Sequence, residues 1–275
     1  MRHEPYDRTV RSPLDSLAVQ WFADLLALGY SPETLRSRQT DLWRFLTFAR
    51  AADLVEVSQI QAPEVLAYRR WMQGLGTLGI KSQRDSLQHL RHLLKWAQRR
   101  GLVQSLPEDE LRLLRTGQRL PRHVMRLDEV ERVLSTPDTR TRSGLRDRVI
   151  LEVFYSTGIR RKELIGLRVD DIQMERGLLL VREGKGRKDR YVPIGQRALT
   201  WLRAYLERVR VHWTGPNDRG ALFLSAKGAP ITVKTLGTVV GGYFRLAGFT
   251  DQGANCHALR HSMATHLMEN GADIR

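Results

Sequence analysis

The stretch 177-GLLLVREGKGRKDRYVPI-194 decides the fold class, because it places two apolar runs around a basic, glycine-rich turn. The runs 178–182 and 190–194 have the length and composition of β-strands. Gly184 and Gly186 allow the backbone between them to turn tightly and to approach a ligand closely. The stretch therefore predicts a β-hairpin, and with it a small antiparallel sheet.

On both sides of this hairpin, the sequence has the periodicity of helices. Gly158 follows one such segment and is expected to end it. The residues from about 122 to 275 are thus expected to form a mixed α+β domain. The expected helices cover 126–135, 145–158, 160–167, 198–213, 231–248 and 258–271, and a further short strand is expected at 221–225.

The first hundred residues are expected to be helical throughout. Ser31 is a suitable N-cap and Pro32 suits the first helical position. Short connections between the helices predict a compact four-helix domain over 1–105, followed by a linker over 106–121 that holds Pro107 and Pro121. The expected helices cover 14–30, 31–50, 63–72 and 80–101. The predicted fold is mainly α, with a small antiparallel sheet in the second domain.

The charge of the chain favours a polyanionic partner. The 275 residues carry a net charge of +15, and arginine, which suits bidentate phosphate contacts, is the commoner cation. Nucleic acid is the most common partner of such a protein. On the helix 80–101 a basic face either contacts phosphates or is simply solvated, and we predict contact by Arg84, Arg91, Lys95, Arg99 and Arg100.

Other classes of protein find little support. Cys256 is the one cysteine, so no internal disulfide can form, and the first ten residues have no apolar signal-peptide core. No run of 18 apolar residues predicts a membrane span. We expect a cytoplasmic protein.

Three basic clusters are candidates for chemistry. In 157-TGIRRKEL-164, Arg160 opens a helix, where backbone N–H groups already favour an anion. In the hairpin turn, Lys185 could donate a proton to an alkoxide leaving group, with Lys188 as the competing candidate. His257 and Arg260 share a helix face and could together contact a phosphate. Each cluster alone is also compatible with ordinary surface residues.

Motifs for cofactor chemistry are not matched. A P-loop requires a glycine where Leu179 stands, and Lys185 is followed by Gly186 rather than by Ser or Thr. His257 and His261 have the spacing of a zinc-protease motif, but Ala258 replaces its glutamate. Asp170 and Asp171 are expected to be solvated. We therefore expect no cofactor and no metal.

The order of the clusters resembles the tyrosine recombinase family (phage integrase, Xer-like) over nearly the whole chain. The segment 31-SPETLRSRQTDLWRFLTFA-49 is similar to the family's core-binding segment, and 160-RRKELIGLRVDDI-172 to the box with its first arginine. The segments 184-GKGRKDRYVPI-194 and 257-HALRHSMATHLMENGADI-274 resemble the lysine and His-x-x-Arg boxes. The resemblance implies a SAM-like core-binding domain (1–105) and a catalytic domain of the DNA breaking–rejoining type (122–275).

The same resemblance implies roles for single residues. Arg160 and Arg260 would hold the scissile phosphate, His257 would hydrogen-bond it, Lys185 would protonate the departing 5′ oxygen, and Glu163 would be a supporting acid. The reaction implied is site-specific recombination or integration through a 3′-phosphotyrosyl intermediate. Duplex DNA and other protomers, as a tetramer on two sites, would be the partners.

The family's pattern continues beyond residue 275 to the nucleophilic tyrosine. All seven tyrosines of this chain precede His257, so none stands at the nucleophile's place. We expect a recombinase truncated at its C-terminus, which binds DNA without covalent cleavage and assembles more weakly. The alternatives are a non-catalytic protein that occupies recombination sites and a basic helical regulator unrelated to recombination.

Overall fold

The computed structural model describes residues 9–112, 124–182, 188–250 and 256–272. The chain divides into two compact units, Met1–Arg119 and Leu120–Arg275. Each unit has its own hydrophobic core.

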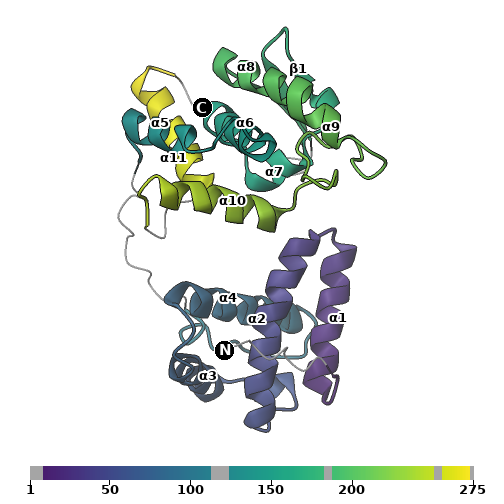
Figure 1. The fold of residues 1–275 in the computed structure, drawn as a ribbon. Coiled ribbons are helices and arrows are strands. Elements are labelled where there is room, and N and C mark those ends of the chain that lie inside the picture. The colour runs from purple at the N-terminus through teal and green to yellow at the C-terminus, as the bar shows by residue number, and fades with distance from the viewer. Residues whose placement is uncertain (1–8, 113–123, 183–187, 251–255, 273–275) are drawn as a thin grey trace. The chain divides into compact units, whose positions relative to one another are not determined.

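The first unit contains the four predicted helices (Figure 1). The side chains of Ser12 and Ser31 accept hydrogen bonds from backbone N–H groups in the first turns of the first two helices, and a proline follows each serine. The helices are α1 (Pro13–Ala27), α2 (Pro32–Ala51), α3 (Ala62–Gly74) and α4 (Ile80–Arg99), with a short 3₁₀ helix η1 (Val57–Gln59) before α3. α2 packs against both α1 and α4.

The core of the first unit lies between these helices. Leu87, Leu90, Leu94 and Ala97 of α4 are fully buried, as the periodicity predicts. Tyr68 of α3 packs edge-on against Phe45 of α2, with ring centroids 5.1 Å apart. Leu111 also belongs to this core. The first unit therefore continues past residue 105, into the segment predicted as a linker; the rest of that segment lies largely outside the described residues.

The second unit combines helices with a small sheet that lies at one side of the unit (Figure 1). β2 pairs antiparallel with both neighbours, and Val181 is opposite Arg190. The strands are β1 (Ile172–Gln173), β2 (Leu178–Val181) and β3 (Arg190–Pro193). The helices are α5 (Leu127–Ser135), α6 (Arg142–Thr157), α7 (Arg161–Gly166), η2 (Val169–Asp171), α8 (Gln196–Tyr205), the π-helical turn η3 (Leu206–Arg210), α9 (Val211–Trp213), α10 (Val233–Leu246) and α11 (Cys256–Glu269).

Two predicted elements differ from the structure. Residues 221–225 are not a strand. Within the part of the chain that the structure describes, they form two single bridges, between Arg168 and Ala221 and between Leu224 and Pro230. The segment is apolar because it is buried, and the hydroxyl of Tyr205 accepts a hydrogen bond from the Leu224 N–H. The predicted helix 198–213 is helical throughout but widens to a π-helical turn after Tyr205.

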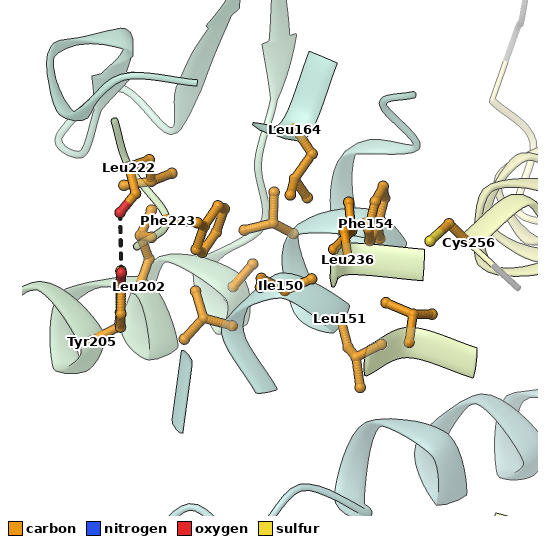
Figure 2. Close-up of a cluster of buried hydrophobic side chains, with 14 of the residues drawn as sticks. Ile150, Leu151, Phe154, Leu164, Leu202, Tyr205, Leu222, Phe223, Leu236 and Cys256 are labelled. Atoms are coloured by element: carbon orange, nitrogen blue, oxygen red, sulfur yellow. Dashed lines mark hydrogen bonds between the residues drawn. The ribbon is translucent and has the colours of Figure 1, made fainter. Parts of the chain in front are cut away.

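The core of the second unit holds the short α7 and the start of α11 in place. α6 contributes Ile150, Leu151 and Phe154, all almost fully buried, as Figure 2 shows. Leu164 is the fully buried residue of α7, and Cys256 begins α11 within the same cluster. The helix starts that carry Arg160 and His257 are thus attached to one rigid core.

Candidate DNA phosphate site

The junction between α6 and α7 is a sharp turn that requires glycine. Gly158 has φ 57° and its N–H donates to the Phe154 carbonyl, which ends α6. A Cβ at this position would lie 3.0 Å from the Met263 Cε of α11. Arg160 follows with extended backbone as the N-cap of α7. The turn therefore brings the first turn of α7 and the middle of α11 close together.

Glu163 is the centre of the site. Its side chain is 7% exposed. Its Oε2 accepts from the backbone N–H of Arg160 at 2.7 Å, and its Oε1 accepts from the Arg160 guanidinium at 2.9 Å. Arg190, the first residue of β3, donates to both carboxylate oxygens at 3.0 and 2.9 Å. One buried carboxylate thus joins α7 to the hairpin.

These hydrogen bonds keep Glu163 ionised. Burial acts to raise its pKa, but the hydrogen bonds from the Arg190 side chain and from the backbone and side chain of Arg160 outweigh burial. The pKa of Glu163 is lowered to about 2. At neutral pH the carboxylate is therefore a fixed negative charge between two guanidinium groups.

Arg260 adds a third guanidinium from α11. It donates a hydrogen bond to the Gly158 carbonyl, at the turn before Arg160. Burial lowers its pKa, and the positive charges of Arg160 and Arg190 lower it further, while Glu163 opposes them. Arg160 and Arg190 thus bind one carboxylate, and Arg260 lies close enough for that carboxylate to affect its pKa. These four groups together carry a charge of +2, which suits a bound anion such as a phosphodiester.

The remaining candidates for catalysis are His257 and the two hairpin lysines, Lys185 and Lys188. His257 is the second residue of α11 and is exposed, one turn before Arg260 on the same helix face. Lys185 lies outside the described residues. Lys188 is exposed, two residues before β3. The structure therefore brings together Arg160, Glu163 and Arg260, and it places His257 one turn before Arg260 on α11.

Sequence reasoning missed Arg190 and misjudged Asp171. Arg190 stood inside the quoted hairpin stretch, but no spacing rule linked it to Glu163, 27 residues earlier. Asp171 was expected to be solvated, and this is wrong: its side chain is 1% exposed. It accepts from the Arg168 N–H at 2.8 Å and from Arg182 at 2.7 Å. Arg182 directly follows β2 and Arg190 begins β3, and each of them binds a buried carboxylate.

The basic face predicted on α4 is partly neutralised. Arg91 and Lys95 both form ion pairs with Glu108. Arg100 pairs with Asp24 and lies over the ring of Trp96, 4.5 Å from its centroid. Of the other two predicted residues, Arg84 is half-buried and Arg99 is exposed. A phosphate that binds here must compete with these partly exposed acidic partners.

Two other features of the described residues bear on function. A pocket of about 310 Å³ lies between α5, α6, α8 and α11, lined by Glu152, Tyr155, Arg197 and His266 among others, and it includes none of the three site arginines. Within the described ranges, no group of three or more His, Cys, Asp and Glu could hold a metal ion. In the same ranges, no helix has the length and hydropathy of a membrane span.

Comparison with known proteins gives the family to which this chain belongs. Residues 123–275 match the Phage integrase family. Tyrosine recombinase XerC 2 of Ralstonia nicotianae is 40% identical over 92% of this chain and 74% of its own length. Tyrosine recombinase XerD of Pseudomonas aeruginosa is 32% identical over 96% and 88%, respectively. The chain belongs to the phage integrase family.

Both of these relatives of the chain are Xer tyrosine recombinases, so the predicted resemblance is confirmed. The fold is confirmed by two solved structures of recombinases on DNA. A λ integrase dimer bound to a COC′ core site matches with a TM-score of 0.74 at 17% identity, over 94% of this chain and 91% of that one. The XerH site-specific recombinase bound to palindromic difH substrate matches with 0.69 at 23% identity, over 87% and 70%.

Proposed function

We propose that the second unit binds a backbone phosphate of duplex DNA between Arg160 and Arg260, as the phosphate site of site-specific strand cleavage and rejoining. The observation that carries this proposal is the uncompensated charge of the arginine cluster around Glu163. Guanidinium groups that are fixed by their neighbours before the phosphate binds stabilise the charge that develops on it during transfer. The family of the chain supports the same role.

In the proposed reaction, the phenolate oxygen of a tyrosine attacks the phosphorus, the bond from phosphorus to the 5′ oxygen breaks, and a 3′-phosphotyrosyl ester forms. The departing 5′ oxygen takes a proton, which we assign to Lys185, and His257 donates a hydrogen bond to a phosphate oxygen. The energy of the broken ester is kept in the new one. No cofactor enters this scheme.

We further propose that these 275 residues bind DNA but supply no nucleophile themselves. Tyr68 and Tyr205 are fully buried. Tyr155 shares a hydrogen bond with His266, and Tyr243 donates to Asp147, so both hydroxyls are engaged. Tyr30 and Tyr191 are exposed, and Tyr191 accepts a hydrogen bond from Gln173. Burial raises the pKa of Tyr243, which makes its phenolate less accessible.

The first unit is proposed as a core-binding domain that contacts DNA with Arg84, Arg91, Lys95, Arg99 and Arg100. Lys188 would contact DNA from the hairpin. Other protomers of the same protein are the proposed partners on DNA, and the cytoplasm is the proposed place of action. A non-catalytic protein that occupies recombination sites is the second candidate, favoured because all seven tyrosines precede His257 in the sequence.

Binding and cleavage are tested separately. The dissociation constant for a 30-base-pair duplex, measured against salt concentration, should give a linear log–log plot with a slope of about 0.9 per phosphate contact. A flat response would refute DNA binding. A nicked duplex that traps cleaved strands should give no protein–DNA adduct in a denaturing gel. An adduct that survives denaturation would show that one of the seven tyrosines is a nucleophile.

A further inference from the structure

Arg190 differs from the other arginines of the site because it belongs to the sheet. It is the first residue of β3 and lies opposite Val181, the last residue of β2. It therefore stands where the hairpin turn rejoins the body of the unit. Its guanidinium places two parallel hydrogen bonds on Glu163, the geometry in which arginine binds a carboxylate most tightly.

Glu163 transmits this contact to Arg160. Its Oε1 accepts from both guanidinium groups, and its Oε2 accepts from Arg190 and from the backbone N–H of Arg160. Both oxygens are thus shared between the hairpin and the N-cap of α7. A carboxylate bound in this way has a single orientation, and the two arginines that hold it are fixed relative to each other.

We propose that Arg190 is a positioning residue. Through Glu163, it fixes the base of the hairpin against the first turn of α7 and holds Arg160 in the orientation that lets Arg160 and Arg260 contact one phosphate. This inference rests on the proposed function of the site. It assigns to Arg190 no contact with the phosphate itself.

The charge of the site gives a second reason for this role. Without Arg190, the carboxylate of Glu163 would be balanced by Arg160 alone, and Arg160 would be drawn to Glu163 rather than to a phosphate. With Arg190 present, the charge of Glu163 is already matched, which leaves Arg160 and Arg260 to attract an anion. Arg190 thus supports the phosphate site while its own guanidinium is occupied.

A double-mutant cycle separates positioning from net charge. Glu163→Gln removes a negative charge, so the net charge of the site rises by one, while the amide oxygen can still accept from the Arg160 N–H. A site that works by net charge alone would therefore bind DNA more tightly. Positioning predicts the opposite: Glu163→Gln and Arg190→Gln should each weaken binding about tenfold, and the double variant no more than either single one. The probe is a duplex selected by the wild-type chain from a randomised pool.

Two outcomes of this cycle would overturn the proposal. Tighter binding by Glu163→Gln would show that only net charge matters. An Arg190→Gln effect that is undiminished in the Glu163→Gln background would make Arg190 a direct phosphate contact. Arg190→Lys keeps the charge but cannot form both hydrogen bonds, so it should behave like Arg190→Gln.

Arg182 is a matched control at the other strand of the hairpin. It directly follows β2 and binds a buried carboxylate, that of Asp171, but none of the contacts described for Asp171 leads to Arg160. Arg182→Gln should leave the affinity within about twofold of wild type. An equal loss in Arg182→Gln and Arg190→Gln would reduce the role of Arg190 to hairpin stability and overturn the proposal.

The protein without DNA provides a readout that does not depend on the proposed function. Lys162 on α7 and Lys188 before β3 are both exposed, and the native thiol of Cys256 is 3% exposed with its pKa raised to about 11 by burial. Spin labels at Lys162→Cys and Lys188→Cys should give a narrow distance distribution that broadens in Arg190→Gln. An unchanged width would refute the positioning role, whereas loss of DNA binding by the wild type would refute only the proposed function.

Discussion

Replacement of Glu163 by glutamine should make the unfolding free energy of the second unit less dependent on pH in the acidic range. A carboxyl whose pKa is lower in the folded than in the unfolded chain stabilises the fold above the unfolded value, and this contribution is lost as the pH falls through the folded value. For Glu163 the pKa is 4.5 in the unfolded chain and about 2 in the folded chain. The stabilisation should therefore be complete at neutral pH and should disappear between about pH 4.5 and pH 2.

The magnitude follows from the same two values. At about 1.36 kcal/mol per pKa unit, the decrease corresponds to at most about 3.4 kcal/mol. The carboxylate is buried, but the side chains of Arg160 and Arg190 are 42% and 37% exposed, so solvent screens part of the attraction. We expect Glu163→Gln to cost about 1–2 kcal/mol at pH 7.

The assay is urea unfolding of wild type and Glu163→Gln at pH 7, 5, 4 and 3. The quantity to compare is the difference in unfolding free energy between the two proteins, because the contributions of carboxyls that both proteins share cancel in this difference. It should be constant from pH 7 to pH 5 and shrink below that. A difference that is independent of pH, or one that vanishes between pH 7 and 5, would refute the assignment of a low pKa to Glu163.

Three further predictions concern the residues around this carboxylate. Gly158→Ala should destabilise the chain by about 1–2 kcal/mol in urea unfolding, because it imposes a left-handed conformation on alanine. Gly166→Ala, where an added Cβ meets nothing within 4 Å, should not destabilise it. Equal effects of the two substitutions would contradict this reasoning. Leu164→Ala should cost about 3–5 kcal/mol in the same assay, and Leu246→Ala, at a residue 75% exposed, close to nothing; a cost below 1 kcal/mol for Leu164 would show that α7 is held otherwise. Arg260→Ala should lower the salt slope of DNA binding by about 1, whereas Arg260→Lys should preserve the slope, and an unchanged slope in Arg260→Ala would place the phosphate elsewhere.

The helices were predictable because their signals are local. Ser31 followed by Pro32 marks the start of α2, and Gly158 has the positive φ that its place after α6 suggested. The hairpin was also predictable, because two apolar runs flank a glycine-rich turn. The two residues of β1 were missed, since a strand of that length has no periodicity of its own, and 221–225 was assigned to a strand because burial alone produces the same apolar run.

The candidate site was predictable in its residue types and not in its connections. Arg160 and Glu163 are three residues apart at a helix start, so their contact follows from spacing. Arg190 could not be joined to them, because strand order and register decide which side chain of β3 reaches α7. Asp171 shows the same limit: an acidic pair in a polar stretch gives no sign that one member is buried beneath an arginine of the next strand.

The two buried carboxylates that bind arginines of the hairpin differ in a way that bears on function. Asp171 and Arg182 balance each other within the sheet and its preceding turn, and they leave no net charge. Glu163 is surrounded by Arg160 and Arg190 and lies close enough to Arg260 to affect its pKa, so the second cluster keeps an excess of positive charge. Holding such an excess of like charge together is unfavourable in the free protein and becomes favourable when an anion is bound. The free energy lost in holding these arginines together is thus recovered on a phosphate, which is why the cluster around Glu163, and not the one around Asp171, is the site we assign to DNA.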